Sequence, residues 1–126
     1  MNTKNVGDLA EEAAEAALIR QGYEVIERNW RGGGAEVDRV AWHEGILVFL
    51  EIRSRADETS GDPAETVRWG KQRRVVRAAV AYLAEWQGRL PDVRFDVVSV
   101  VRGRRTKVLV FRDAFDAGVM GGAPMV

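Results

Sequence analysis

The sequence contains no cysteine and only one histidine, His43. The absence of cysteine excludes disulfide bonds, thiolate metal sites and cysteine nucleophiles, and a single histidine argues against a histidine-rich zinc centre or a histidine-based triad. No apolar stretch approaches the roughly 20 residues that span a bilayer. The N-terminus is polar and lacks the apolar core of a signal peptide, so we expect a cytoplasmic protein without a membrane partner.

A chain of 126 residues is long enough to bury one hydrophobic core and too short for two domains. We therefore expect a single domain over residues 1–117. The residues that follow are rich in glycine, which predicts a flexible C-terminal tail over residues 118–126.

The formal net charge is zero, from 19 basic and 19 acidic residues, which by itself argues weakly against a nucleic-acid partner. The charges are unevenly distributed, however. Residues 68–77 contain five basic side chains and no acidic one, and residues 102–107 contain four more basic side chains. If these two clusters meet in space, they form one basic surface. Taken singly, they are also compatible with a solvated helix face and a charged turn.

Hydrophobic periodicity and turn residues predict a helix, three strands, a second helix and two further strands. The first helix would end before Gly22, and the second would begin at Asp62 with Pro63 in its first turn. This order predicts an α/β fold with a mixed central sheet flanked by helices. The predicted ranges are 7–21, 23–28, 35–42, 46–53, 62–87, 93–101 and 106–111, with a turn over 29–34, a polar loop over 54–61, and a buried stripe on the first helix made of Leu9, Ala10, Ala13, Ala14, Ala17 and Leu18.

The strand predicted over 46–53 is apolar on both faces until it reaches Glu51 and Arg53, which share one face because strand side chains alternate. If Glu44-Gly45 is a two-residue hairpin loop, residues whose numbers sum to 89 lie opposite each other. That register places Asp38 across from Glu51, with Cβ atoms roughly 4.5–5.5 Å apart. It also places Glu36 across from Arg53. Two facing carboxylates repel each other, and a divalent cation between them would remove the conflict.

Each of these charged residues, and Glu11 of the predicted first helix, also has a purely structural interpretation, which the sequence leaves open. Glu51 would form a buried ion pair, and Glu11 would lie on a solvated acidic helix face. Arg53 would pair with Glu36 across the strands, and Asp38 would pair locally with Arg39 or Arg55.

Several short motifs occur in one order along nearly the whole chain. They are Gly7-Asp8 with Glu11 and Ala14, Gly22-Tyr23, Arg28-Asn29, Glu36-Val37-Asp38, the run from Phe49 to Arg55, Val67 with Lys71-Gln72, the run from Arg94 to Val98, and Ala114-Phe115. In this order and spacing the chain resembles the YraN-like family of uncharacterised bacterial proteins. That family is in turn similar to the PD-(D/E)xK, restriction-endonuclease-like nuclease superfamily. The resemblance implies a three-layer fold of order αβββαββ, in which an acid and an acid-x-lysine motif lie on adjacent strands.

The resemblance implies that Asp38 and Glu51 bind a metal ion, Mg²⁺ or Mn²⁺, with Glu11 of the first helix as an accessory acid and ligand. Arg53 occupies the position of the superfamily lysine, which makes it the fourth expected catalytic residue. An arginine keeps its proton at any relevant pH and cannot act as a general base, although it can clamp a phosphate. This departure leaves the predicted fold intact and leaves catalysis open.

Basic and polar residues around the start of the second helix form the predicted surface for a nucleic-acid backbone. They are Arg55, Arg68, Lys71, Gln72, Arg73, Arg74 and Arg77. We expect a divalent-metal-dependent endonuclease that cleaves DNA according to its structure rather than its sequence. A homodimer is the expected oligomeric form, because nucleases of this kind that act on branched DNA are often dimers. The alternatives are a catalytically inactive nucleic-acid-binding module of the same fold and a protein-interaction adaptor.

Overall fold

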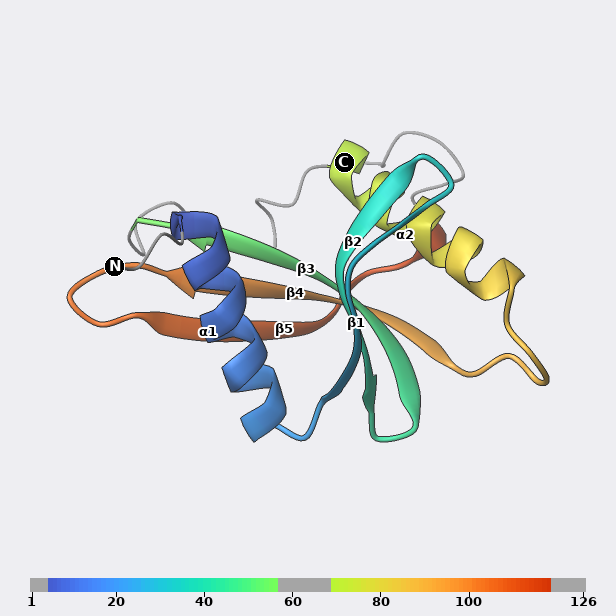
Figure 1. Ribbon diagram of the computed structural model, residues 1–126, viewed down its shortest axis with the longest axis horizontal. Coiled ribbons are helices and arrows are strands. Elements are labelled where there is room, and N and C mark those ends of the chain that lie inside the picture. The colour runs from blue at the N-terminus through green and yellow to red at the C-terminus, as the bar shows by residue number, and fades with distance from the viewer. Residues whose placement is uncertain (1–4, 57–68, 119–126) are drawn as a thin grey trace.

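The computed structural model describes residues 5–56 and 69–118 and shows a five-stranded sheet between two helices (Figure 1). The sheet order is β1-β2-β3-β4-β5, with β3 and β4 parallel and the other neighbours antiparallel. This arrangement confirms the predicted α/β class, the mixed sheet and the order αβββαββ, and it is consistent with a three-layer nuclease-like fold. The elements are α1 (Val6–Arg20), β1 (Glu24–Gly32), β2 (Ala35–His43), β3 (Ile46–Arg55), α2 (Trp69–Ala84), β4 (Val93–Val101) and β5 (Lys107–Phe115). Within these described ranges no helix is long and apolar enough to cross a membrane.

Helix α1 covers one face of the sheet. Asn5 caps it by accepting a hydrogen bond from the Asp8 N–H at 2.8 Å. Ala14 and Leu18 are fully buried in a core cluster with the β3 side chains Val48 and Leu50. Leu9, predicted to share this stripe, is instead 45% exposed. Its position is rotated by roughly 100° from that of Ala10 about the helix axis, which takes it off the buried side.

Helix α2 covers the opposite face. Its start predicted at Asp62 lies outside the described residues, and its last residue is Ala84 rather than the predicted Gln87. Val75 and Ala79 pack with Phe49 of β3 and Phe95 of β4 in the larger core cluster. The two helices therefore bury the two faces of the central strands, which explains why β3 is apolar on both sides.

The first hairpin differs from the prediction. The segment predicted as a turn over 29–34 continues β1 through Gly32, and only Gly33 and Gly34 form the turn, with φ of 61° and 75°. Both values lie in the left-handed region that a two-residue hairpin loop requires. Asn29, with φ of 50°, lies inside β1, and the pairing with β2 keeps one register on both sides of it. In the sequence, Asn29 and the three glycines that follow it resemble a turn. Strand β5 likewise runs past its predicted end at Phe111, through an irregular Asp113 with φ of 54°.

The second hairpin follows the predicted register. Glu44 and Gly45 form its turn, with φ of 52° and 80°, and the paired residues from Arg39↔Leu50 to His43↔Ile46 all sum to 89. The regular pairing stops at Arg39. Beyond that point β2 leaves β3 and continues with β1 as a two-stranded ribbon that passes over α2 (Figure 1). The sheet therefore opens into a fork immediately beside Asp38.

Candidate functional site

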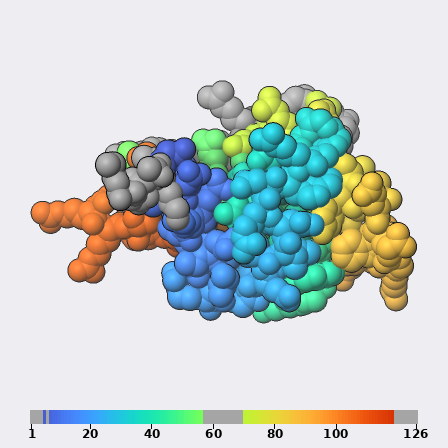
Figure 2. Space-filling model, in the orientation of Figure 1, coloured from blue at the N-terminus to red at the C-terminus, as the bar shows by residue number. Residues whose placement is uncertain are grey.

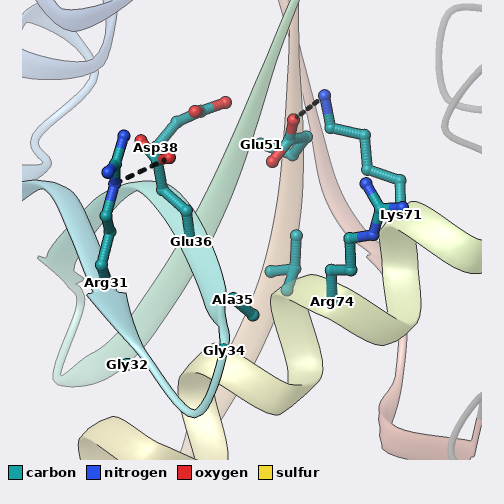
Figure 3. Close-up of a pocket in the computed structure, with 10 residues that line it drawn as sticks. Arg31, Gly32, Gly34, Ala35, Glu36, Asp38, Glu51, Lys71 and Arg74 are labelled. Atoms are coloured by element: carbon teal, nitrogen blue, oxygen red, sulfur yellow. Dashed lines mark hydrogen bonds and ion pairs between the residues drawn. The ribbon is translucent and has the colours of Figure 1, made fainter.

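A cleft of about 840 Å³ occupies the fork between β2, β3 and the first turns of α2 (Figure 3). The ribbon formed by β1 and β2 supplies one wall, and β3 with α2 supplies the other. The described residues that line it are Arg31, Gly32, Gly34, Ala35, Glu36, Asp38, Glu51, Lys71, Arg74 and Val75. Both predicted metal-binding carboxylates therefore reach the same cleft.

Asp38 stands at the point where the two strands separate. Its Oδ2 accepts a hydrogen bond from the backbone N–H of Ile52 at 2.8 Å. This side chain satisfies a β3 donor at the place where the regular β2–β3 ladder has ended. Asp38 has thus a structural partner as well as a position in the cleft. The predicted opposition to Glu51 holds as proximity and not as a pair within the ladder.

Glu51 is the most perturbed carboxyl group of the site. Its side chain is only 3% exposed, and Lys71 of α2 forms an ion pair with it. The pKa of Glu51 is raised to about 8, first by burial and then by the nearby Asp38 carboxylate, while Lys71 opposes both effects. Without another cation, Glu51 therefore carries a proton at neutral pH. The structural alternative of a buried ion pair is realised through Lys71, yet it does not return the pKa to its ordinary value.

Arg53 follows Glu51 on the same face of β3 and is partly exposed. Among the described residues, none forms a hydrogen bond or ion pair with its guanidinium group. The alternative pairing with Glu36 is wrong, because Glu36 accepts a hydrogen bond from Arg31 of β1 at 3.2 Å. Lys71 is therefore the basic group that meets the buried acid, from a helix rather than from the strand position that Arg53 occupies.

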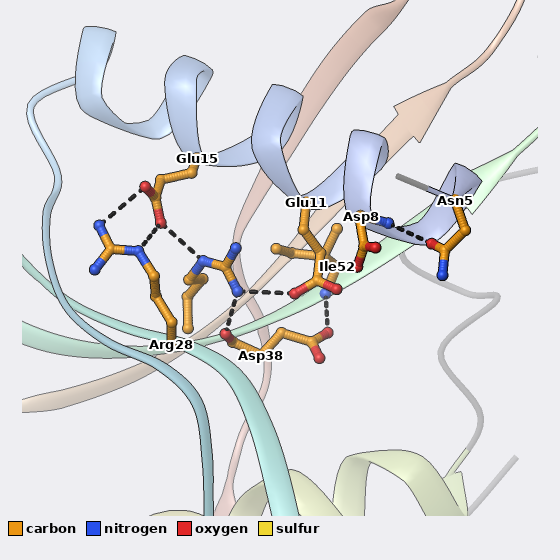
Figure 4. Close-up of polar contacts among 8 residues, drawn as sticks. Asn5, Asp8, Glu11, Glu15, Arg28, Asp38 and Ile52 are labelled. Atoms are coloured by element: carbon orange, nitrogen blue, oxygen red, sulfur yellow. Dashed lines mark hydrogen bonds and ion pairs between the residues drawn. The ribbon is translucent and has the colours of Figure 1, made fainter. Parts of the chain in front are cut away.

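Glu11 belongs to a network on the α1 side of the sheet (Figure 4). Its Oε1 accepts a hydrogen bond from Arg39 at 2.8 Å, and Arg39 also donates to Glu15 at 2.9 Å. The same Arg39 guanidinium donates to the backbone carbonyl of Asp38 at 2.7 Å. Hydrogen bonds from Arg28 and then Arg39 hold the pKa of Glu15 below its usual range. Glu11 is therefore connected to the site through buried Arg39, and the alternative of a solvated acidic face does not apply to it.

The carboxylates fit a cation that keeps most of its water. Within residues 5–56 and 69–118 there is no group of three or more histidine, cysteine, aspartate or glutamate side chains arranged to hold a metal ion. Asp38 and Glu51 supply two carboxylates, and Mg²⁺ is commonly bound by one or two protein carboxylates together with several waters. Glu11 already forms an ion pair with Arg39. To act as a ligand, its carboxylate would have to contact both Arg39 and the metal ion.

The predicted nucleic-acid surface is only partly assembled at the cleft. Lys71 and Arg74 line it, whereas the described lining does not include Arg55, Gln72, Arg73 or Arg77, and Arg68 lies outside the described residues. The two basic clusters do not form one patch: the turn between β4 and β5 projects at the far left of Figure 1, apart from α2. Sequence reasoning missed Arg31, which reaches the cleft because β1 extends to Gly32. The signal for it was the Gly33-Gly34 pair, since a two-residue loop there places Arg31 opposite Glu36.

Comparison with known proteins gives a family for this arrangement. Residues 10–100 match the uncharacterised protein family UPF0102. The chain belongs to this family. It is 44% identical to a UPF0102 protein of Myxococcus xanthus over 117 residues, which cover 92% of this chain and 93% of the relative. It is 43% identical to one of Methylibium petroleiphilum over 124 residues, covering 93% and 98% of the two chains. The expected membership of the YraN-like family is thereby confirmed.

A third relative extends the comparison. The UPF0102 protein of Symbiobacterium thermophilum is 39% identical over 117 residues, which cover 91% of this chain and 99% of the relative. The family match includes the fork, α2 and α1 from residue 10 onward, so it contains Glu11, Asp38, Glu51 and Lys71. It ends before the turn between β4 and β5. The family description assigns no activity, so function must be argued from the site itself.

Proposed function

We propose that this member of the UPF0102 family is a divalent-metal-dependent endonuclease that binds nucleic acid and cleaves DNA phosphodiester bonds. The observation that carries the proposal is the proximity of Asp38 to Glu51 in an open cleft that Arg31, Lys71 and Arg74 also line, where the pKa of Glu51 is raised to about 8. A carboxyl group with so perturbed a pKa costs folding free energy, and such groups cluster at functional sites. An ion pair needed only for folding would not require a second carboxylate beside it.

The proposed ligands are Asp38 and Glu51, with Glu11 as an accessory acid that orients the site through Arg39. A bound Mg²⁺ or Mn²⁺ would neutralise charge on the scissile phosphate and lower the pKa of a bound water. Asp38 would keep its hydrogen bond to Ile52 while it binds the cation, which fixes the direction of its carboxylate. Glu51 would exchange its proton for the cation.

The basic residues of the cleft have roles that follow from their chemistry. Lys71 is placed to release Glu51 and to donate to a phosphate oxygen or to the attacking water. Arg74, on the same wall, would neutralise a neighbouring phosphate. Arg53, the residue at the superfamily lysine position, is not part of the described cleft lining but follows Glu51 on the same face of β3. From there it would clamp a phosphate through its planar guanidinium group, and it cannot accept a proton.

The proposed substrate is DNA recognised by shape. Arginine and lysine contacts to phosphates position a backbone and carry no base sequence, so a branched, flapped or single-stranded junction fits such a site better than a sequence motif does. Action on two strands of a branch would require two copies of the cleft, and a homodimer is therefore part of the proposal.

A second candidate, a nucleic-acid-binding module without catalysis, is favoured by one observation. Lys71 already contacts Glu51 in the absence of a metal ion, and no lysine follows Glu51 on β3. This version predicts salt-dependent binding of DNA or RNA that is insensitive to chelator. The protein-interaction adaptor predicts no affinity for nucleic acid at moderate salt.

The test compares cleavage of labelled duplex, flapped, branched and single-stranded DNA with Mn²⁺, with Mg²⁺ and with EDTA. Wild-type protein should cut at least one branched or single-stranded substrate only with metal, and Asp38→Asn and Glu51→Gln should abolish cutting. Glu24→Gln, at an exposed position of β1 outside the described cleft lining, is the matched control and should cut normally. Absence of cutting on every substrate would remove the enzymatic proposal, and a gel shift across ionic strength then separates the binding module from the adaptor.

A further inference from the structure

The turn between β4 and β5 carries an unusual density of unpaired positive charge. Arg102, Arg104 and Arg105 are all exposed, and none of them forms an ion pair with an acidic side chain of the described residues. In Figure 2 this turn, coloured orange, projects clear of the rest of the molecule. Three like charges in four residues repel one another, and a bound polyanion would relieve that repulsion.

The turn lies beside the end of β3, the strand that carries Glu51. The Arg102 N–H donates to the Arg55 carbonyl at 2.8 Å, which joins the turn to the end of β3. Arg55 is paired in register with Val101 of β4, and Val101 with Lys107 of β5, so Arg55 and Lys107 lie in one row across three strands. Glu51, Arg53 and Arg55 share a face of β3 because they alternate along it. A polyanion that leaves the cleft along β3 therefore meets basic residues up to the turn.

The separation between cleft and turn follows from the strand register. Glu51 is paired with Val97, and Val101 is four residues further along β4, which corresponds to about 13 Å at the usual rise of a strand. The arginines of the turn therefore lie about 15–20 Å from Glu51. Backbone phosphates in one DNA strand repeat about every 3.4 Å, so this span corresponds to about five nucleotides.

We propose that the β4–β5 turn is a second phosphate-backbone contact, which engages a nucleic acid about five nucleotides from the cleft, on the side where β3 ends. The identity of the partner rests on the proposed function. The chemistry favours nucleic acid over an anionic membrane surface. The turn has no large apolar side chain to enter the acyl boundary, whereas arginine recognises phosphate oxygens with a two-pronged donor geometry. The substrate therefore extends beyond the cleft, and a fragment confined to the cleft lacks part of the binding energy.

The test measures equilibrium binding in EDTA, so that cleavage does not enter. Wild type is compared with the double variant Arg104→Gln/Arg105→Gln and with the control Arg20→Gln/Arg89→Gln, which removes the same charge from exposed positions elsewhere. The probes are labelled single-stranded DNAs of about 6 and about 12 nucleotides, titrated at several salt concentrations. We expect the turn variant to lose about tenfold or more of its affinity for the longer probe at 0.1 M salt, and its salt slope to fall by about one to two.

The length dependence identifies the site. Wild type and control should bind the longer probe more tightly than the shorter one, and the turn variant should lose most of that gain. If the turn variant and the control bind the longer probe equally, the turn is not a phosphate contact and the inference is overturned while the proposed function stands. If wild type binds neither probe nor branched DNA at low salt, the proposed function fails, and the inference fails with it. Preferential binding to anionic vesicles over DNA would also overturn the inference.

Discussion

The Asp38 carboxylate accepts a hydrogen bond from the Ile52 backbone N–H at 2.8 Å, in place of the β2–β3 pairing, whose last pair is Arg39 with Leu50. One side chain thereby stabilises the fork in the sheet and faces the cleft that the fork creates. Asp38 therefore belongs both to the candidate site and to the point where β2 separates from β3. Its substitution consequently affects both stability and chemistry, and the two effects must be separated.

Asparagine and alanine at position 38 should separate these effects. In Asp38→Asn the side-chain carbonyl still accepts from Ile52, whereas Asp38→Ala leaves that N–H without its partner, at a cost of about 1–3 kcal/mol. We expect thermal unfolding to show Asp38→Ala less stable than Asp38→Asn, and both variants to lose metal-dependent cleavage. Equal stability of the two variants would show that the bond to Ile52 does not support the fork.

The stability of the folded protein should depend on pH through Glu51. Its pKa is about 8 in the folded state and close to 4.5 when unfolded, so between these values the folded form holds a proton that the unfolded form has released. The free energy of unfolding should therefore fall as the pH rises from about 5 to about 8, by up to a few kcal/mol. Glu51→Gln keeps the shape without the charge, and it should be more stable than wild type at pH 8–9 and lack this slope. A wild-type profile that is flat or rises over this range contradicts the assignment.

Metal binding should be coupled to the same proton. If Glu51 must lose it before it binds Mn²⁺, the apparent affinity should increase about tenfold per pH unit up to about pH 8 and then level off. Calorimetry at pH 6.5 in buffers of different ionisation enthalpy should detect the release of about one proton for each Mn²⁺ bound. The same titration of Mn²⁺ into the Glu24→Gln variant is the control, and it should give the wild-type result because Glu24 is outside the described cleft lining. Binding without proton release would place the cation away from Glu51.

The sequence contained the register of the site because a local signal determined it. A two-residue loop at Glu44-Gly45 fixes which residues of β2 and β3 face each other, and the apolar run around Glu51 identifies the central strand. The same rule applied to Gly33-Gly34 would have extended β1 and found Arg31. Asn29 and the run of three glycines hid that hairpin, because residues of this kind are typical of a turn and end a predicted strand.

Other parts of the site depend on how elements dock, which no local pattern encodes. The contact of Lys71 with Glu51 requires α2 to lie across the fork at a particular height and rotation. The capture of Glu11 by Arg39 likewise depends on burying an arginine, 6% exposed, between α1 and the sheet. Periodicity identifies the buried side of a helix, but it does not specify which strand residue lies beneath each turn.

Lys71→Gln should raise the pKa of Glu51 further, because the lysine cation is the group that opposes burial and the Asp38 carboxylate. The side-chain carboxyl signal of Glu51, followed by NMR across pH, measures this directly. Arg77→Gln, on the same helix but outside the described cleft lining, removes an equal charge and should leave the signal unchanged. A shift of equal size in both variants would mean that Glu51 senses the net charge of α2 and not a specific partner.

Glu11→Gln should weaken the fold and the site together. Arg39 is buried and is held by Glu11 at 2.8 Å and by Glu15 at 2.9 Å, so loss of one carboxylate leaves a buried guanidinium partly uncompensated. We expect a loss of about 1–3 kcal/mol in the free energy of unfolding, compared with a few tenths for Asp8→Asn, an exposed acid on the same helix. Cleavage should fall as well, because Arg39 fixes the Asp38 carbonyl.

Measurement of Mn²⁺ affinity completes this comparison. As an accessory acid that acts through Arg39, Glu11 should change the affinity less than Asp38→Asn does. The conservative variant Glu11→Asp should recover only part of the stability and cleavage that Glu11→Gln loses, because its shorter side chain places the carboxylate further from Arg39. If Glu11→Gln instead keeps wild-type stability and loses as much Mn²⁺ affinity as Asp38→Asn, then Glu11 is itself a metal ligand, and its ion pair with Arg39 must open when the cation binds.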